Sequence, residues 1–304
     1  MAIQSRIKKV WKRIDGVLLL DKPSGMTSNS ALQCARRLFS AAKAGHTGTL
    51  DPLATGLLPL CFGEATKFSA DLLEADKTYE ADVLFGVTTD TGDAEGEVVE
   101  RRPVAFSPEA LDQALAHFTG PISQIPPMYS ALKRDGKPLY ELARQGIEVE
   151  RQPRDVTIHE LQLIEFSGDC CRLRVTCSKG TYIRTLAEDI GNRLGCGAHL
   201  TALRRTAVGA LRIADAVTLD QLNALAEEER GASLQAPDSL LQTLPAVRLD
   251  DESAQRFSHG NPVVVTMGLD VVPGKCRVYD PTRLLGLGEI DADGCVKPRR
   301  LVCA

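Results

Sequence analysis

The sequence predicts an α+β protein, and three observations lead to that prediction. Short apolar runs that fit strands alternate with segments of helical period, but their spacing is too irregular for a repeated βαβ unit. The chain has 304 residues, 43% of them apolar, which suffices for one large domain and a small one. After residue 244 short apolar runs alternate with Gly, Pro and Asp turns, as in small β-rich domains. We therefore expect domains over residues 1–243 and 244–304.

Local patterns place the elements of the larger domain. Strands are expected over residues 14–20, 78–85, 155–166 and 170–177, where apolar residues run together or alternate. Helices are expected over residues 28–39, 65–73 and 181–194 and from Ser107-Pro108 onward, where apolar residues recur at helical spacing. The stretch 121–153 is rich in Pro, Gly and basic residues around one short helix near residues 139–145. We interpret this stretch as an insertion.

Composition argues against a membrane, secreted or metal-binding protein. The longest apolar runs, residues 17–20 and 57–62, are too short to cross a bilayer, and no long apolar segment follows the basic start. Nine cysteines without any Cys-x-x-Cys pair fit the reduced thiols of a cytoplasmic protein. Cys196 and His199 are three residues apart, but no second pair completes a zinc site. We expect a cytoplasmic protein with no bound metal.

The net charge of −4 conceals an uneven distribution of basic residues. Residues 1–13 contain five basic residues and no acid, and residues 172–205 contain seven basic residues and two acids. The acids gather elsewhere, in residues 71–100 and 215–252. Ordinary solvated surfaces explain most such runs, but a segregated basic surface for RNA phosphates is the alternative.

The run Gly45–Gly56 surrounds one carboxylate, Asp51, with glycines, threonines and a proline. Glycine lets a ligand approach the backbone closely, and Pro52 disfavours the helical conformation for Asp51. A stiff, crowded loop can therefore present one reactive oxygen at a fixed position. The alternative is an Asp-Pro turn whose carboxylate only caps a backbone N–H, and spacing alone does not decide between them. The run lacks the Gly-Lys-Ser/Thr ending of a nucleoside triphosphate loop.

Five segments, in the same order along the chain, resemble the bacterial pseudouridine synthases of the TruB type, which isomerise a uridine in the T loop of tRNA. The segments are residues 20–28, 45–56, 63–68, 125–133 and 177–186. The resemblance implies the pseudouridine synthase fold, with a central mixed, largely antiparallel sheet flanked by helices. It also implies that residues 121–153 form a thumb that grips RNA. A weaker likeness at residues 260–263 and 286–301 implies that residues 244–304 are a PUA-like RNA-binding domain.

The resemblance implies a catalytic role for Asp51 as the nucleophile, with Arg184 as its ion-pair partner. An opposite charge within ~4–6 Å lowers the pKa of a carboxylate, so we expect Arg184 to keep Asp51 ionised. Tyr79 and Tyr182 match the aromatic residues of the uridine pocket, and we expect Tyr79 to act in the C5 proton transfer. By spacing alone, Tyr79 fits a half-buried core residue and Arg184 a surface residue of a helix. The sequence leaves open whether the aspartate attacks the sugar, attacks the base or removes a sugar proton.

Three further residues match the substrate-binding set of the family. His46 matches a histidine that contacts RNA and holds the loop open after the base leaves its stack; a general base is the second choice. Leu203 matches a leucine of the uracil pocket, although core packing explains it nearly as well. We place Lys22 with this set as a brace for the Asp51 loop. The candidate phosphate contacts are Lys133, Arg134, Lys137, Arg144, Arg204 and Arg205.

The isomerisation involves no redox change and no group acquired from outside, so we expect no cofactor. We expect a monomer that acts on the uridine at position 55 in the T arm of tRNA, without a membrane, an obligatory protein partner or a guide RNA. One alternative is an RNA-binding or tRNA-folding protein with a vestigial pocket, which an intact set of site residues disfavours. The other is a guide-directed enzyme of the archaeal and eukaryotic type, which the insertion over residues 121–153 and the absence of long basic tails disfavour.

Overall fold

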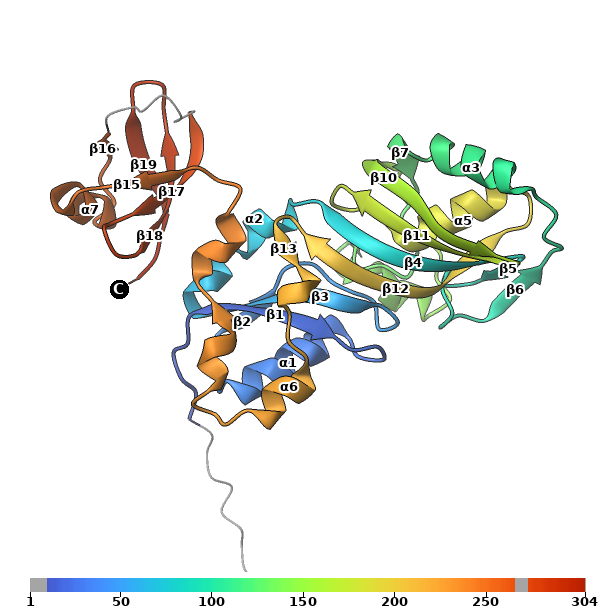
Figure 1. Cartoon of the computed structure of the whole chain (residues 1–304), viewed down its shortest axis with the longest axis horizontal. Coiled ribbons are helices and arrows are strands. Elements are labelled where there is room, and N and C mark those ends of the chain that lie inside the picture. Colours follow the sequence, from blue (N-terminus) through green and yellow to red (C-terminus); the bar gives the residue numbers. More distant parts are fainter. Residues whose placement is uncertain (1–9, 266–272, 304) are drawn as a thin grey trace, which may run out of the picture.

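The structure, a computed structural model, describes residues 10–265 and 273–303 and contains a large sheet with helices and a smaller carboxyl-terminal sheet (Figure 1). The first elements are β1 (Gly16–Lys22), α1 (Ser28–Leu38), β2 (Ala44–His46), β3 (Thr55–Phe62), the 3-10 helix η1 (Gly63–Lys67), α2 (Ser69–Leu73), β4 (Lys77–Phe85), β5 (Val87–Thr89), β6 (Val98–Arg101), α3 (Pro108–His117) and β7 (Gly120–Gln124). Next come β8 (Lys133–Arg134), β9 (Lys137–Pro138), α4 (Leu139–Ala143), β10 (Arg154–Ser167), β11 (Cys170–Cys177), α5 (Ile183–Arg193), β12 (Ala198–Val208), β13 (Leu211–Arg212), η2 (Ile213–Asp215), α6 (Leu219–Ala224), η3 (Arg230–Ser233), β14 (Leu234–Gln235) and η4 (Pro237–Leu241). The carboxyl-terminal elements are β15 (Ala246–Arg248), α7 (Asp251–Ser258), β16 (Val263–Val264), β17 (Gly274–Tyr279), β18 (Leu284–Ile290) and β19 (Cys295–Leu301).

Ten strands of the described residues form the large sheet, in the order β14-β1-β3-β12-β4-β11-β10-β7, with β2 paired to β3 and β13 to β12. β3 and β12 run parallel, and the other neighbours in this sheet run antiparallel. The expected α+β fold, with a mixed and largely antiparallel sheet flanked by helices, is confirmed. The smaller sheet has the order β15-β17-β18-β19-β16.

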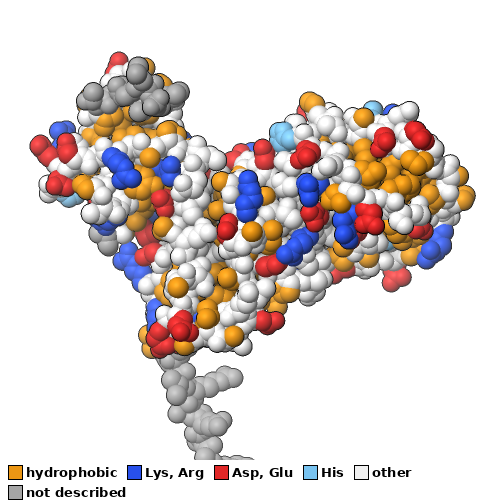
Figure 2. Space-filling view, viewed as in Figure 1, with side chains coloured by type: hydrophobic (Ala, Val, Ile, Leu, Met, Phe, Trp, Pro, Cys, Tyr) orange, Lys and Arg blue, Asp and Glu red, His pale blue; other side chains and the backbone are white. Residues whose placement is uncertain are grey.

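The half of the sheet made by β4, β11 and β12 has one apolar and one polar face. Along β4 the residues alternate strictly, so that Tyr79 and Ala81 point into the core beneath α3 and α5, while Glu80 and Asp82 point away from it. The outward face carries ion pairs such as Arg172–Asp82, whose nitrogen and oxygen lie 2.6 Å apart. Figure 2 shows basic and acidic side chains side by side across the middle of the molecule. This face is therefore close to neutral.

The half of the sheet made by β1 and β3 is covered on both faces. Leu18 and Leu20 of β1 belong to the same core cluster as residues of α1 and α6, whereas Val17 and Leu19 pack with η4 and with Leu287 of the smaller sheet. An ion pair between Lys275 and Asp71, 3.1 Å long, also joins the smaller sheet to α2. Because both faces are buried, β1 is an almost continuous apolar run.

One expectation about the elements was wrong, and one element was missed. Residues 65–73 form two short helices, η1 and α2, rather than one helix, and the fully buried Phe68 is the residue between them. Residues 198–208 were assigned no element, yet they form β12 in the middle of the sheet. Arg204 and Arg205 concealed this strand, because the side chain of Arg205 is buried although its type is usually exposed. The remaining expected strands and helices are present, with bounds that differ by a few residues.

The basic start of the chain lies mostly outside the described residues, which begin at residue 10. All nine cysteines are free. Within residues 10–265 and 273–303, no helix is long and apolar enough to cross a membrane. The same residues contain no cluster of three or more His, Cys, Asp or Glu side chains that could hold a metal ion.

Candidate active site

The loop that carries Asp51 is tied to the segment between β1 and α1. The hydroxyl of Ser28 accepts a hydrogen bond from the backbone N–H of Leu50, at 2.8 Å, and donates to the carbonyl of the same residue, at 2.9 Å. The backbone N–H of Gly25 donates to the carbonyl of Pro52, at 2.9 Å. These bonds fix the residues on both sides of Asp51, so the carboxylate has little freedom to move.

The side chain of Lys22 also holds the Asp51 loop in place through hydrogen bonds to backbone carbonyls. Its side chain is fully buried, and its Nζ donates to the carbonyls of Pro23, Met26 and Pro52 at 2.8, 2.6 and 3.4 Å. Burial lowers the pKa of Lys22 to about 8, and the nearby charge of Asp51 opposes that fall. The interpretation of Lys22 as a brace agrees with this geometry. Its place among the substrate-binding residues stays a prediction, and in this structure its ammonium is surrounded by backbone carbonyls.

Arg184 lies between two carboxylates. One of its terminal nitrogens is 3.1 Å from Oδ2 of Asp51, and the other is 3.5 Å from Oδ2 of Asp93. The same nitrogens donate to the carbonyls of Tyr129 and Thr91, at 2.6 and 2.8 Å. The guanidinium is almost completely buried at the start of α5, so the prediction of a surface arginine from spacing alone does not hold. The predicted Arg184–Asp51 pair is present.

Asp93 is a site residue that sequence reasoning missed. It is buried, accepts a hydrogen bond from the Thr91 hydroxyl at 2.6 Å, and holds the side of Arg184 that faces away from Asp51. Gly92 has a φ of +72°, and a Cβ there would lie 2.9 Å from Oε1 of Glu188. In the sequence Asp93 belongs to an acidic stretch that we interpreted as solvated surface. The turn formed by Thr91, Gly92 and Asp93 was the sequence feature that could have indicated a site residue here.

The pKa of Asp51 is raised, whereas a lowered pKa was expected. Burial raises the pKa of the Asp51 carboxyl above its ordinary value, and the charges of Arg184 and Lys22 only partly oppose this. We expected Arg184 to lower the pKa of Asp51. The charge of Arg184 does lower it, but burial raises it by more, so the net pKa is raised. The side chain remains 42% exposed, toward a cavity rather than toward a flat surface. Because its pKa is raised, the ionised Asp51 carboxylate is more basic than that of an ordinary aspartate.

A cavity of about 270 Å³ opens beside Asp51 and contains the predicted aromatic residues. Tyr79 and Leu203 line it from β4 and β12, and both are 9% exposed. Tyr182 lines it from the start of α5, where its backbone N–H donates to the Gln124 side chain at 3.0 Å. Burial raises the pKa of both tyrosines above the ordinary value. Asp51, Arg184, Tyr79, Tyr182 and Leu203 are thus brought together, as the resemblance implied.

Two buried cations in the wall of this cavity were not assigned to the site from sequence. Arg205 is 1% exposed, and its guanidinium donates to the carbonyls of Leu57 and Gly48 at 2.7 and 3.4 Å. Lys77 is 8% exposed and donates to the carbonyls of Leu73 and Ala75. Burial lowers the pKa of Lys77 to about 8. Arg205 was a candidate phosphate contact, and its burial in the sheet does not favour that role.

Two further residues predicted to contact RNA, His46 and Arg204, do not line the Asp51 cavity. His46 ends β2, is half-buried and is not among the residues that line the cavity; burial lowers the pKa of its ring below the ordinary value. Its role as an RNA contact remains a prediction. Arg204 projects to the opposite face from Arg205 and forms a two-pronged pair with Asp21, at 3.0 and 2.7 Å. A carboxylate therefore already occupies the guanidinium of Arg204.

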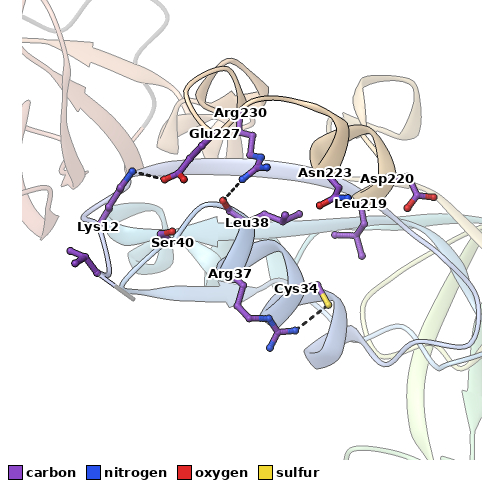
Figure 3. A pocket seen from close by; sticks show the side chains of 11 residues that line it. Lys12, Cys34, Arg37, Leu38, Ser40, Leu219, Asp220, Asn223, Glu227 and Arg230 are labelled. Atoms are coloured by element: carbon purple, nitrogen blue, oxygen red, sulfur yellow. Dashed lines mark hydrogen bonds and ion pairs between the residues drawn. The ribbon is translucent and has the colours of Figure 1, made fainter. Parts of the chain in front are cut away.

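A larger cavity of about 700 Å³ lies elsewhere, between α1, α6 and the segment before β1 (Figure 3). Lys12 pairs with Glu227 across it at 2.6 Å, and Arg230 donates to the carbonyl of Leu38 at 2.8 Å. These contacts join segments that are far apart in the sequence. The smaller cavity combines a carboxylate, two phenols and buried cations, so we take it as the active site.

Comparisons with solved structures show the class of the fold. A chain in the structure titled "Crystal Structure of a Cbf5-Nop10-Gar1 Complex" aligns with a TM-score of 0.71 and 25% identity, over 94% of this chain and 84% of that one. A second chain, from "Structure of H/ACA RNP bound to a substrate RNA containing 2'-deoxyuridine", aligns with a TM-score of 0.72 and 24% identity. The chain therefore has the fold of the pseudouridine synthases.

Sequence comparisons show the family within this class. Residues 36–183 match the model described as "TruB family pseudouridylate synthase (N terminal domain)", and two further models, for the carboxyl-terminal regions of TruB proteins, match residues 184–245 and 245–302. The tRNA pseudouridine synthase B of Dechloromonas aromatica is 63% identical over 98% of both chains. That of Burkholderia lata is 62% identical over 99% of this chain and 94% of its own. The chain belongs to the TruB family of pseudouridylate synthases.

Proposed function

We propose that the protein isomerises uridine to pseudouridine in tRNA, at position 55 of the T loop, with Asp51 as the residue that begins the reaction. The strongest support is the cavity in which Asp51 is paired with Arg184 and faces Tyr79 and Tyr182. The close relatives in Dechloromonas aromatica and Burkholderia lata are named tRNA pseudouridine synthase B, which supports tRNA as the substrate.

The arrangement fits a reaction that detaches and rejoins one base. Isomerisation breaks the bond between N1 and the sugar, turns the uracil, joins C5 to the sugar and releases the C5 proton. Arg184 engages Oδ2 of Asp51 at 3.1 Å, and the Asp51 side chain is still 42% exposed, toward the cavity. The carboxylate is therefore accessible to the sugar or the base, and both routes are compatible with the cavity. The enclosed wall keeps water away from the detached base.

A uridine in a folded T loop reaches such a cavity only after it leaves its stack, which costs a few kcal/mol. We propose that residues 121–153 and 244–304 supply part of the binding energy through RNA contacts. Residues of the first segment, Ser130 and Ala131, line the cavity directly. Lys133, Arg134, Lys137 and Arg144 lie on the same segment and are largely exposed, which suits phosphate contacts.

We further propose that the enzyme works as a monomer without a guide RNA, a protein partner, a cofactor or a metal, in the cytoplasm. Relatives that are 62–63% identical carry the tRNA-directed name, whereas the solved neighbours from Cbf5 and H/ACA complexes are 23–25% identical. A role in tRNA folding can coexist with catalysis, since RNA binding and isomerisation use different parts of the surface.

The test uses a T-arm stem-loop with a hydrogen isotope at C5 of the target uridine, because isomerisation releases that hydrogen to water. The purified chain alone is expected to release the label, and Asp51→Asn is expected to release none while it binds the stem-loop nearly as well. Asp220→Asn, an exposed change in α6, serves as the matched control. Release by Asp51→Asn at the wild-type rate would contradict the assignment of Asp51.

The remaining alternatives give different results in the same assay. Label release that requires a guide RNA or a second protein would favour guide-directed action. Binding without any release by the wild-type protein would favour a folding protein with an inactive pocket. Binding that weakens steeply as salt rises would support the phosphate contacts of residues 121–153.

A further inference from the structure

Arg205 occupies a central position in the sheet beneath the active site. In the register of the strands its backbone is opposite Gly56 of β3 on one side and Tyr79 of β4 on the other. A Cβ on Gly56, whose φ is +100°, would lie 2.3 Å from the carbonyl oxygen of Arg205, so only glycine permits this approach. The close packing fixes Arg205 between the strand that follows the Asp51 loop and the strand that carries Tyr79.

The side chains of Arg205 and Tyr79 share one face of the sheet. Directly opposed residues of an antiparallel pair have Cβ atoms about 4.5–5.5 Å apart, so the guanidinium and the phenol are neighbours. Both side chains are at least nine-tenths buried and both line the cavity. The carbonyls of Leu57 and Gly48 hold the guanidinium in place. Arg205 therefore connects the Asp51 loop, β3 and Tyr79.

The charge of Arg205 is not neutralised by protein. Within the described residues no carboxylate lies within 4 Å of its nitrogens, whereas its neighbour Arg204 is paired with Asp21. Lys77, two residues before Tyr79 on the same face of β4, likewise has no carboxylate within 4 Å in that part of the chain. A buried cation without a counterion costs free energy, so a transient negative charge nearby would be strongly stabilised.

We propose that Arg205 is a positioning residue that orients the Tyr79 phenol and stabilises its phenolate while Tyr79 removes the C5 proton. The inference rests on the proposed function and extends it to a residue that does not touch the reacting atoms. Burial raises the pKa of Tyr79, and the charge of Arg205 acts against that rise. This explains why only one of the two adjacent arginines is paired with a carboxylate. Arg204 stabilises the fold through Asp21, whereas Arg205 stabilises the Tyr79 phenolate.

The chemical step is balanced without an added reagent. Once C5 has joined the sugar it still carries its hydrogen, and the ring has a C6=N1 double bond in place of the C5=C6 double bond. The C5–H bond then breaks, its electron pair re-forms the C5=C6 double bond, the C6=N1 electron pair moves to N1, and the proton is transferred to the phenolate oxygen. N1 takes up one proton from water, and the neutral phenol returns its proton to water after the product leaves. A phenol with a higher pKa provides less phenolate, and this step slows.

The experiment compares wild type with Arg205→Met on a T-arm stem-loop that carries hydrogen or deuterium at C5. Raising the phenol pKa by one to two units lowers the phenolate fraction roughly 10- to 100-fold at neutral pH, and the rate of product formation should fall by a similar factor. The isotope effect should increase, because C5 deprotonation becomes slower than the other steps. Arg204→Met is the matched control and should leave the isotope effect at the wild-type value.

A pH profile gives a second readout. The deficit of Arg205→Met should shrink as the pH rises, since phenolate forms at higher pH. The other titratable groups around Tyr79 are Cys177 of β11, Asp51 of the loop and Lys77 of its own strand. Burial lowers the pKa of Lys77 to about 8, so its loss of charge would reduce the rate at high pH, in the opposite direction. The recovery should persist in a Cys177→Ser background.

Arg205→Lys covers the case in which the methionine variant does not fold. It keeps a buried cation with poorer geometry and should give a smaller loss with a raised isotope effect. A slow variant of either kind with an unchanged isotope effect, or an Arg205→Met enzyme as fast as wild type, would overturn the inference. If the wild-type protein releases no C5 label at all, the proposed function fails instead, so the two failures are distinguishable.

Discussion

Two cavities of this molecule, the one beside Asp51 and the larger one between α1 and α6, differ in how their charged groups are paired. In the cavity between α1 and α6, Lys12 pairs with Glu227, and Arg230 is held by backbone carbonyls. In the smaller cavity beside Asp51, the buried cations Arg205 and Lys77 have no carboxylate within 4 Å among the described residues. The larger cavity is thus a gap between segments joined by paired charges. In the cavity beside Asp51, Arg205 and Lys77 keep charges that no carboxylate neutralises, and this lowers the stability of the fold.

The comparison leads us to use unneutralised buried charge, rather than cavity size, as the criterion for the proposed active site. Burying a charge without a partner costs several kcal/mol, so a fold retains such a group where it interacts with a ligand or a reaction intermediate. The pKa shifts around the smaller cavity agree with this, since burial raises the pKa of Asp51 and lowers the pKa of Lys77 to about 8. Substitutions in the two cavities should therefore have very different effects.

The largest effect is expected for Arg184→Met. The change leaves Asp93 buried without its cation and removes the partner of Asp51, so the free energy of unfolding should fall by about 3–5 kcal/mol. Product formation should fall by a factor of roughly 10³ or more, because the carboxylate loses its orientation and charge balance. Urea unfolding and C5 label release measure the two effects.

The double variant Arg184→Met/Asp93→Asn separates the two effects. Neutralising Asp93 removes the isolated buried charge, so part of the lost stability should return while activity stays low. Recovery of activity together with stability would mean that Arg184 acts only through the fold. In that case the Asp51 cavity would resemble the larger cavity in having structural charges.

A smaller effect, with a distinct pH dependence, is expected at Glu188, which lies one turn after Arg184 on α5. Burial and the charge of Asp189 raise the pKa of Glu188 to about 7, from 4.5 for an ordinary glutamate. An acid whose folded pKa is raised binds its proton more tightly in the folded state. The stability it contributes is therefore full below about pH 4.5 and is lost as the pH rises to about 7.

Glu188→Gln should accordingly stabilise the protein at pH 8, by about 1–3 kcal/mol, and change little at pH 4.5. Urea unfolding at the two pH values measures the difference, and Glu97→Gln, a change at an exposed residue, is the control. An equal change at both pH values would contradict the pKa assigned to Glu188. A loss of activity with unchanged stability would instead place Glu188 among the residues that position Arg184.

The sequence was sufficient for those parts of the site that lie in continuous motifs. Asp51 was selected because the run around it resembles a TruB motif, since its spacing alone left a simple Asp-Pro turn open, and Tyr182 and Arg184 lie together in a second motif. β12 was missed because the two adjacent arginines in it suggest surface, although one faces solvent and the other the core. Which of two adjacent arginines is buried depends on strand register, and a single sequence does not specify register.

The role of Asp93 could not be predicted for a related reason. Its partner Arg184 is distant in the sequence, and the two meet because the loop after β5 passes over the start of α5. The net pKa of Asp51 could not be predicted either, because it depends on a balance between desolvation and Arg184 that only the folded geometry sets. Motif recognition thus supplied the candidate catalytic residues, whereas tertiary structure supplied their electrostatic environment.

The smallest effect is expected in the larger cavity, for Glu227→Gln. Lys12 and Glu227 are each about half exposed, so the loss of their pair should change the free energy of unfolding by less than about 1 kcal/mol. C5 label release should stay within about twofold of wild type, since a half-exposed pair is strongly screened by solvent. A tenfold loss of activity in Glu227→Gln, with stability unchanged, would show that the larger cavity takes part in the reaction. The pairing of charged side chains would then not distinguish the active-site cavity from the larger one, and cavity size would again have to be considered.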